Sequence, residues 1–263
     1  MGVKQLNYLS IARHLERAEL ERLEVKRITL DHPQLAIEDG YRIQEELIKS
    51  KLDKGYRIIG PKMGLTSQAK MKQMNVDEPV YGYIFDYMVV ENGGKLSLKE
   101  LIHPKVEVEI AFVLNCDLQG PGVTEQDVLE ATDYVVPALE IIDSRYENFQ
   151  FTLPDVIADN ASSSRVVFGT RLVKPDSIDL GLVGATLFIN GELKALGAGT
   201  AVLGHPARSV AMLANILGRK GKKVEAGQII LTGGITEAIL LNAGDCVTAR
   251  LDQIGEVGFI LTK

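Results

Sequence analysis

The sequence predicts an α+β protein in which a mainly helical N-terminal domain, residues 1–78, precedes a larger β-rich domain, residues 79–263. Two observations carry this prediction. Apolar residues recur at helical spacing among many charges up to about residue 54. From about residue 81, short β-branched and aromatic runs alternate with Gly-containing turns. We therefore expect a mixed β-sheet in the second domain.

Two helices are predicted in the first domain. One lies within residues 5–25 and has a charged, solvated face, and the other runs over residues 37–54 and ends at a glycine. After a short strand, the Gly- and Pro-containing segment 60–67 predicts a turn that opens onto a further helix at 68–74. Lys62 lies in this turn, where the glycines would allow a ligand to approach the backbone closely.

The second domain is predicted to contain strands with two short helices between them. The strands are expected at 81–90, 105–114, 134–143, 186–189 and from 228 onward, and the helices at 125–132 and 209–217. Thr124 and Asp127 form a capping-box-like start for the first of these helices, and Asn190-Gly191 is typical of a tight hairpin. We interpret His205, which precedes the second helix, as a packing or capping residue rather than a base.

Three glutamates in apolar runs indicate a metal site. Glu107 and Glu109 are two positions apart in the run 105–114, so a strand points both carboxylates to one face. Glu140 lies in a second apolar run and has no basic residue near it before Arg145. Buried carboxylates need compensation, and three that converge would suit a hard cation. The alternative is a half-exposed antiparallel strand with its acids in water, which fits Glu140 poorly.

Composition and charge narrow the classes of partner. The chain of 263 residues is 46% hydrophobic and carries a formal net charge of -6, which argues against nucleic acid or an anionic membrane surface. No apolar stretch reaches the roughly 18 to 20 residues of a membrane span, and no signal-peptide core is present, so we expect a cytoplasmic protein. Cys116 and Cys246 suggest neither a disulfide framework nor a zinc site. The expected ligand is a small molecule.

Five short segments together carry a resemblance to a known family. They are Lys62-Met63-Gly64-Leu65-Thr66-Ser67, the pair Glu107 and Glu109, the segment 137–145, the segment 158–162, and Leu203-Gly204-His205-Pro206. With these segments in this order, the chain from about residue 8 onward resembles the fumarylacetoacetate hydrolase superfamily. Within the superfamily, it is similar to the hydratase/decarboxylase branch.

The resemblance implies a role for particular residues. The metal ligands that it implies, for Mg²⁺ or Mn²⁺, are Glu107, Glu109 and Glu140. The active-site lysine that it implies is Lys62. The substrate-binding positions that it implies are Leu65, Thr66, Val80, Ser162 and Thr232. Hydratases of the branch tend to carry an acid at the place of Val80, so an apolar residue there resembles the decarboxylases.

The resemblance also implies an activity. It is the metal-dependent decarboxylation of a small dicarboxylic 2-keto acid, 2-oxo-3-hexenedioate, to 2-hydroxypenta-2,4-dienoate and CO₂ in meta-cleavage catabolism of aromatic compounds. The alternatives are hydration of 2-hydroxypenta-2,4-dienoate on the same scaffold, acylpyruvate hydrolysis, and a non-catalytic subunit with a structural metal. Retention of Lys62 and the three glutamates argues against the last of these. We expect a homo-oligomer and, because members of this branch associate, a complex with a paralogous hydratase.

Overall fold

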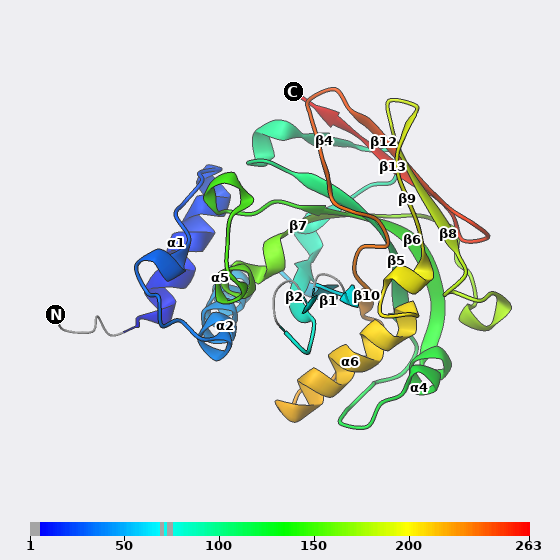
Figure 1. Cartoon of the computed structure of the whole chain (residues 1–263), viewed down its shortest axis with the longest axis horizontal. Helices are drawn as coiled ribbons and strands as arrows, with labels where there is room; N and C mark the ends of the chain where they lie inside the picture. Colours follow the sequence, from blue (N-terminus) through cyan, green and yellow to red (C-terminus); the bar gives the residue numbers. More distant parts are fainter. Residues whose placement is uncertain (1–5, 69–70, 73–75) are drawn as a thin grey trace.

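The computed structural model describes residues 6–68, 71–72 and 76–263, and two β-sheets with flanking helices make up this part of the chain (Figure 1). The helices longer than one turn are α1 (Tyr8–Glu21), α2 (Ile37–Asp53), α4 (Glu125–Glu130), α5 (Leu153–Ala158) and α6 (Pro206–Arg219). Figure 1 shows α1, α2 and α5 together on the N-terminal side of the molecule, with the C-terminal strands on another side.

The first sheet has the strand order β2-β1-β10-β5-β6-β7-β3, and β11 also pairs with β5. Its strands are β1 (Ile58–Gly64), β2 (Val80–Phe85), β3 (Val89–Val90), β5 (Lys105–Leu114), β6 (Thr132–Ile142), β7 (Ser163–Phe168), β10 (Ile229–Leu231) and β11 (Ile239–Leu240). The second sheet has the order β4-β13-β12-β8-β9. Its strands are β4 (Lys95–Ser97), β8 (Gly184–Ile189), β9 (Glu192–Ala198), β12 (Cys246–Leu251) and β13 (Gly255–Thr262). Both sheets contain parallel and antiparallel pairs, so the prediction of an α+β fold with mixed sheet is confirmed.

Local signals in the sequence explain where the helices begin. The side chain of Asn7 accepts a hydrogen bond from the N–H of Ser10 and caps α1. Pro206 is the first residue of α6, where its missing N–H costs nothing. Nδ1 of His205 accepts a hydrogen bond from the N–H of Ala207 at 3.2 Å, so the capping interpretation of this histidine is confirmed.

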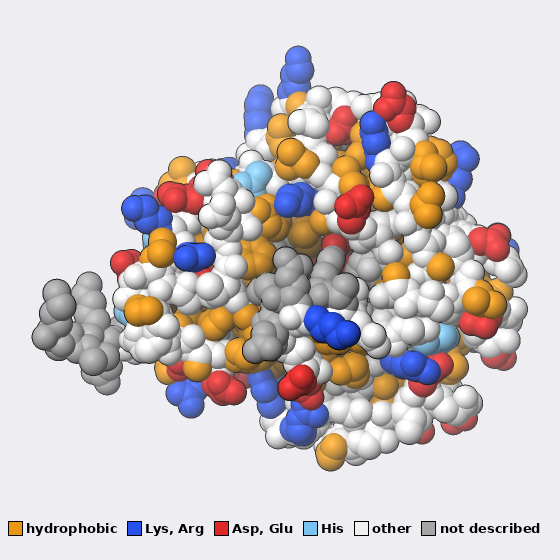
Figure 2. Space-filling model, viewed as in Figure 1, with side chains coloured by type: hydrophobic (Ala, Val, Ile, Leu, Met, Phe, Trp, Pro, Cys, Tyr) orange, Lys and Arg blue, Asp and Glu red, His pale blue; other side chains and the backbone are white. Residues whose placement is uncertain are grey.

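The surface of the described residues carries both signs of charge. Figure 2 shows basic and acidic side chains interspersed over the face in view, and the described residues of this face form no broad basic patch. Among the helices that the structure describes, none is long and apolar enough to cross a membrane.

Strand β5 is buried on both faces. One face carries apolar residues that belong to the largest core cluster, together with side chains of the second sheet: Val106, Val108, Ile110 and Phe112 from β5, and Val257 and Phe259 from β13. The other face carries Glu107 and Glu109, whose exposed fractions are 8% and 0%. A half-exposed strand with its acids in water is therefore excluded.

The turn predicted at 60–67 is wrong for its first five residues, which belong to strand β1. This strand pairs antiparallel with β2 and parallel with β10, with Lys62 opposite Leu231. Gly60 serves the close approach of β10, because a Cβ at this position would lie 1.9 Å from the carbonyl oxygen of Ile229. The glycine therefore marks contact between strands, and Lys62 is held by a sheet rather than by a turn.

The strand predicted at 81–90 is divided in two. A short 3₁₀ turn, Asp86–Met88, separates β2, which pairs with β1, from β3, which pairs with β7. Oδ1 of Asp86 accepts hydrogen bonds from the backbone N–H groups of Arg57 and Tyr87. A local side-chain acceptor of this kind competes with ladder pairing, which explains the interruption.

The chain on both sides of residue 78 contributes to one sheet, since β1 and β2 are neighbours in it. The division into domains 1–78 and 79–263 stays a prediction. Part of the helix predicted at 68–74 lies outside the described residues, and its described members, Gln68, Met71 and Lys72, are helical.

Candidate active site

Strands β5 and β6 bring the three predicted glutamates together. The strands are antiparallel, and their register places Glu107 directly opposite Glu140, with Glu109 two residues further along the same face of β5. One carboxylate oxygen from each residue lies within 4.8 Å of the others. Both Glu109 and Glu140 are fully buried. The convergence expected from the sequence is thus present in the structure.

Burying three ionised carboxylates side by side costs free energy unless a cation compensates their charge. Burial and the neighbouring charge of Glu140 raise the pKa of Glu109 well above its usual value, and burial raises the pKa of Glu140 despite the opposing charge of Lys62. Within the described part of the chain, Oε1 of Glu109 and Oε1 of Glu140 have no hydrogen-bond partner. Unsatisfied buried carboxylate oxygens in a cluster are what a hard, oxygen-preferring cation would coordinate, so these residues fit Mg²⁺ or Mn²⁺.

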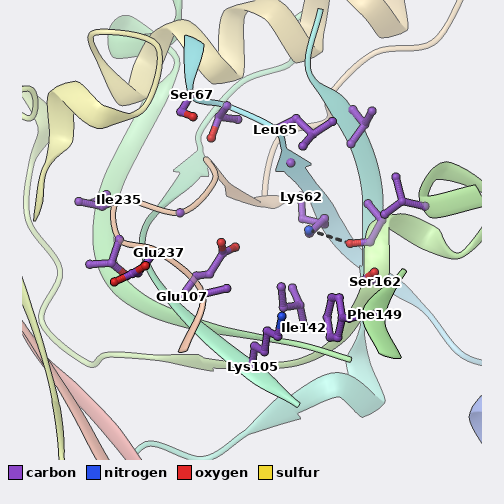
Figure 3. A pocket seen from close by; sticks show the side chains of 18 of the residues that line it. Lys62, Leu65, Ser67, Lys105, Glu107, Ile142, Phe149, Ser162, Ile235 and Glu237 are labelled. Atoms are coloured by element: carbon purple, nitrogen blue, oxygen red, sulfur yellow. Dashed lines mark hydrogen bonds between the residues drawn. The ribbon is translucent and has the colours of Figure 1, made fainter. Parts of the chain in front are cut away.

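Lys62 provides the positive charge next to the cluster. Its ammonium lies 3.0 Å from Oε2 of Glu140 and donates a hydrogen bond to the carbonyl oxygen of Ala161 at 3.2 Å (Figure 3). Burial alone would lower the pKa of Lys62, but the charges of Glu140, Glu109 and Glu107 outweigh burial, and the pKa is raised. Lys62 is therefore a protonated donor at the edge of the glutamate cluster.

A strained turn supplies the carbonyl oxygen that binds Lys62. The residues of Asn160–Ser162 all have left-handed φ angles, 49°, 51° and 57°, which non-glycine residues rarely adopt. The guanidinium of Arg145 holds this turn by pairing with the carboxylate of Asp159 and by donating to its carbonyl oxygen. It also donates to the carbonyl oxygens of Asp143 at 2.8 Å and Ser163 at 3.1 Å. The buried arginine thus explains how the strain is maintained.

The turn presents polar groups to the site. The carbonyl of Ala161 accepts from Lys62, whereas the side chain of Asn160 is bound at both ends by the backbone of Tyr83, at 2.8 and 2.9 Å. Oγ of Ser162 is buried and has no partner among the described residues. A buried hydroxyl left without a partner indicates a group that a ligand would satisfy.

Of these residues, Lys62, Glu107, Ala161 and Ser162 line a cavity of about 400 Å³. The lining residues predicted from the sequence are Lys62, Leu65, Thr66, Val80, Glu107 and Ser162. Figure 3 shows the side chains of Lys62, Glu107 and Ser162 directed toward the same space. A cavity of this size, with apolar walls and a few convergent charged groups, suits a small organic acid.

Thr232, the remaining predicted substrate-binding residue, does not line this cavity. Its side chain is fully buried, and Oγ1 donates a hydrogen bond to the carbonyl oxygen of Ile110 at 2.9 Å. The next residue, Gly233, donates its N–H to Oε2 of Glu109 at 2.7 Å. Thr232 therefore anchors the segment that orients Glu109, and its contact with substrate stays a prediction.

Comparison with known proteins agrees with this geometry. The sequence pattern described as "Fumarylacetoacetate (FAA) hydrolase C-terminal" matches residues 55–259. The chain belongs to the fumarylacetoacetate hydrolase family. The resemblance inferred from the short sequence segments is confirmed.

Relatives within the family are similar over nearly the whole chain. A 4-oxalocrotonate decarboxylase of Pseudomonas putida is 49% identical over 249 residues, which cover 95% of this chain and 94% of the relative. A 2-oxo-hept-4-ene-1,7-dioate hydratase of Escherichia coli is 40% identical, and 94% of this chain and 95% of the hydratase are covered. The solved structure of 4-oxalocrotonate decarboxylase from Pseudomonas putida G7, complexed with magnesium and adipate, has a TM-score of 0.96 at 45% identity and covers 99% of each chain.

Several residues that line the cavity were not among the site residues predicted from the sequence, although the segments 146–149 and 232–236 resemble those of decarboxylases. Lys105, Ile142 and Phe149 lie together on one side of it (Figure 3), and the segment 234–238 lies near Glu107. The period of a strand could have identified Lys105, which is two positions before Glu107 and shares its face. Tertiary packing brings the segment 234–238 to β5, where the N–H of Ile235 donates to the carbonyl oxygen of Val108 at 2.8 Å.

Proposed function

We propose that the protein is a divalent-metal-dependent decarboxylase that converts 4-oxalocrotonate (2-oxo-3-hexenedioate) to 2-hydroxypenta-2,4-dienoate and CO₂. The observation that carries the proposal is the cluster of Glu107, Glu109 and Glu140 with Lys62, beside a partly apolar cavity that Lys62 and Glu107 line. Two relatives named as 4-oxalocrotonate decarboxylases, at 49% and 48% identity, are more similar to the chain than the hydratases compared with it, at 40 to 41%, although a third relative of the same decarboxylase name is 39% identical.

The cofactor that we propose is Mg²⁺ or Mn²⁺. Glu107, Glu109 and Glu140 would hold it through carboxylate oxygens only, a ligand set that favours these metals over zinc. When bound, the metal supplies Lewis-acid stabilisation for negative charge that develops on the 2-oxo oxygen of the substrate. The similar solved structure is complexed with magnesium, which supports this assignment.

The electrons released by decarboxylation need a sink. Cleavage of the bond between C5 and C6 releases CO₂ and leaves the electron pair of that bond on C5. This pair forms a C4=C5 double bond, the C3=C4 bond becomes C2=C3, and the C2 carbonyl oxygen takes up the negative charge as an enolate. Lys62 is protonated and borders the cluster, so its ammonium can stabilise this enolate or give it a proton. Ser162, whose hydroxyl has no partner among the described residues, is placed to hydrogen-bond the same ligand.

The wall around Val80 distinguishes decarboxylation from hydration. Val80 lines the cavity and packs in an apolar cluster with Leu153, Val156, Ile157 and Ala161. Hydration needs a group that positions and deprotonates water, which a carboxylate at this position could do and a valine cannot. The hydratase on the same scaffold is therefore the second candidate.

Replacing Val80 with aspartate is expected to weaken decarboxylation and to admit slow hydration of 2-hydroxypenta-2,4-dienoate. The reason is that a carboxylate would bring water into an apolar wall. Initial rates of both reactions check the prediction, with Val80→Asn as a control of equal size without the charge. Thermal unfolding of both variants shows whether the fold survives. Decarboxylation by a folded Val80→Asp variant at the wild-type rate would exclude a role for Val80 in the chemistry.

One experiment tests the proposed activity against the alternatives. Purified protein is incubated with Mg²⁺ and 2-oxo-3-hexenedioate, and formation of the dienol and of CO₂ is followed with and without a chelator. A decarboxylase releases both products in equal amounts only when metal is present. In parallel incubations with the dienol or with an acylpyruvate in place of 2-oxo-3-hexenedioate, a hydratase consumes the dienol without releasing CO₂, an acylpyruvate hydrolase cleaves the acylpyruvate, and a non-catalytic subunit does neither.

We also propose that the protein acts in the cytoplasm, forms a homo-oligomer and associates with a paralogous hydratase. The proposal rests on the resemblance to enzymes of the hydratase/decarboxylase branch. Sedimentation velocity of the protein alone and mixed with such a hydratase measures both kinds of association. Monomers in both samples at micromolar concentration would contradict them.

A further inference from the structure

Lys105 brings a second ammonium to the cavity. It is the first residue of β5, lies opposite Ile142 of β6, and shares its strand face with Glu107. Figure 3 shows its side chain beside Ile142 and Phe149, on a different side of the cavity from Lys62. The two lysines therefore approach the bound ligand from separate directions.

The two ammonium groups differ in their partners. Lys62 is paired with Glu140, whereas no carboxylate of the described residues forms an ion pair with Lys105. Its ammonium instead lies over the ring of Phe149, with Nζ 4.1 Å from the ring centroid. A partly buried ammonium that has an aromatic partner but no anion is available to bind the anionic group of a ligand.

The ring that supports this ammonium is held firmly. Phe149 contacts the rings of His103 and Phe151, with centroids 5.0 and 6.0 Å away. The turn that carries it has left-handed φ angles at Asn148 and Phe149, 57° and 59°. Glu24 stabilises this turn by accepting from the N–H of Asn148 at 3.0 Å, and it also pairs with Nδ1 of His103 at 2.9 Å. The position of the ammonium is thus built into the fold.

We infer that Lys105 binds the carboxylate at the far end of a dicarboxylic ligand, so that the cavity selects six-carbon diacids over monoacids. The inference rests on the proposed function, in which the 2-oxo end of the ligand lies at the glutamate cluster. Two residues along a strand span about 7 Å, which is comparable to the separation of the carboxylates in an extended six-carbon diacid. Apolar side chains such as Ile142 and Val156 line the same cavity and suit the carbon chain.

The other charges of the cavity agree with this assignment. Lys62 is already paired with Glu140 of the glutamate cluster. Glu237 also lines the cavity, but its side chain is exposed, so water screens its repulsion of a ligand carboxylate. The ion pair with Lys105 forms in the ground state and weakens as the carboxylate becomes neutral CO₂. Loss of Lys105 should therefore raise KM more than it lowers kcat.

Calorimetric titration in the presence of Mg²⁺ tests the subsite with adipate and hexanoate, a six-carbon diacid and its monoacid. We expect Lys105→Met to weaken adipate binding by about tenfold or more and to change hexanoate binding by less than about threefold. Lys105→Arg should retain most of the preference for adipate. Lys99→Met, which removes an exposed lysine away from the cavity, is the matched control and should bind both ligands as the wild type does.

Thermal unfolding of each variant verifies that the fold is kept. Equal weakening of adipate and hexanoate, or no weakening of either, would overturn the subsite, because the role of Lys105 would then be structural or absent. Failure of wild-type protein to bind adipate more tightly than hexanoate would overturn it as well. Selective loss of adipate binding in a protein that does not release CO₂ would instead contradict the proposed reaction and leave the subsite intact.

Discussion

Replacing Lys62 with methionine is expected to lower kcat by a factor on the order of 10² or more while Mg²⁺ binding survives. The ammonium is buried, protonated and 3.0 Å from Glu140, so it borders the place where the enolate charge would develop. Methionine keeps the length and the apolar part of the side chain but removes the charge and the donor. Steady-state kinetics with saturating Mg²⁺ measures the effect.

Lys62 and Lys105 serve as controls for each other. A residue that only binds substrate raises KM and leaves kcat nearly unchanged, which is the pattern expected for Lys105→Met. Magnesium titration of Lys62→Met shows whether the glutamate cluster remains intact, and removal of a neighbouring positive charge should not weaken metal binding. A near-normal kcat for Lys62→Met would remove Lys62 from the catalytic residues.

Replacing any one of Glu107, Glu109 or Glu140 with glutamine is expected to abolish metal-dependent turnover while the fold is kept. Glutamine has nearly the shape of glutamate but lacks the charge that a divalent cation requires. Because Glu109 and Glu140 are fully buried near like charges, the loss of one carboxylate also relieves repulsion in the metal-free protein. Each variant should therefore fold without metal.

Metal titration calorimetry and thermal unfolding check this prediction independently of activity. In the wild type, Mg²⁺ at about 100 times its Kd should add about 2.7 kcal/mol to the free energy of unfolding, and this stabilisation should be lost in the three variants. Glu91→Gln, an exposed glutamate outside the site, is the matched control. Unchanged metal affinity in all three variants would exclude the cluster as the metal site.

Much of the site could be predicted from local patterns. The period of a strand places Glu107 and Glu109 on one face, and the apolar surroundings of Glu140 identify it as a third buried carboxylate. The register that sets Glu107 opposite Glu140 could not be predicted in this way. A slip of one residue would turn Glu140 to the other face of β6, and packing on both faces of the sheet decides against that slip.

The turn predicted around Lys62 shows why other predictions from the sequence were wrong. Gly60 and Pro61 are typical of turns, but β10 approaches so closely that only glycine fits beside Ile229, and the segment becomes a strand. The partner strand lies more than 160 residues away in the chain, so no local pattern reports it. The same holds for the carbonyl of Ala161, which reaches Lys62 from 99 residues away.

By itself, the sequence determined the long helices α1, α2 and α6, the glutamate-bearing strands β5 and β6, and the chemical types of the functional residues, because these depend on propensity and periodicity among neighbours in the chain. Only the tertiary structure decided which charges meet. It paired Lys62 with Glu140, turned the hydroxyl of Thr232 away from the cavity to the backbone of Ile110, and left Lys105 without an anion. The physical reason is that the charge state and availability of a buried group depend on partners that only packing brings within a few ångströms.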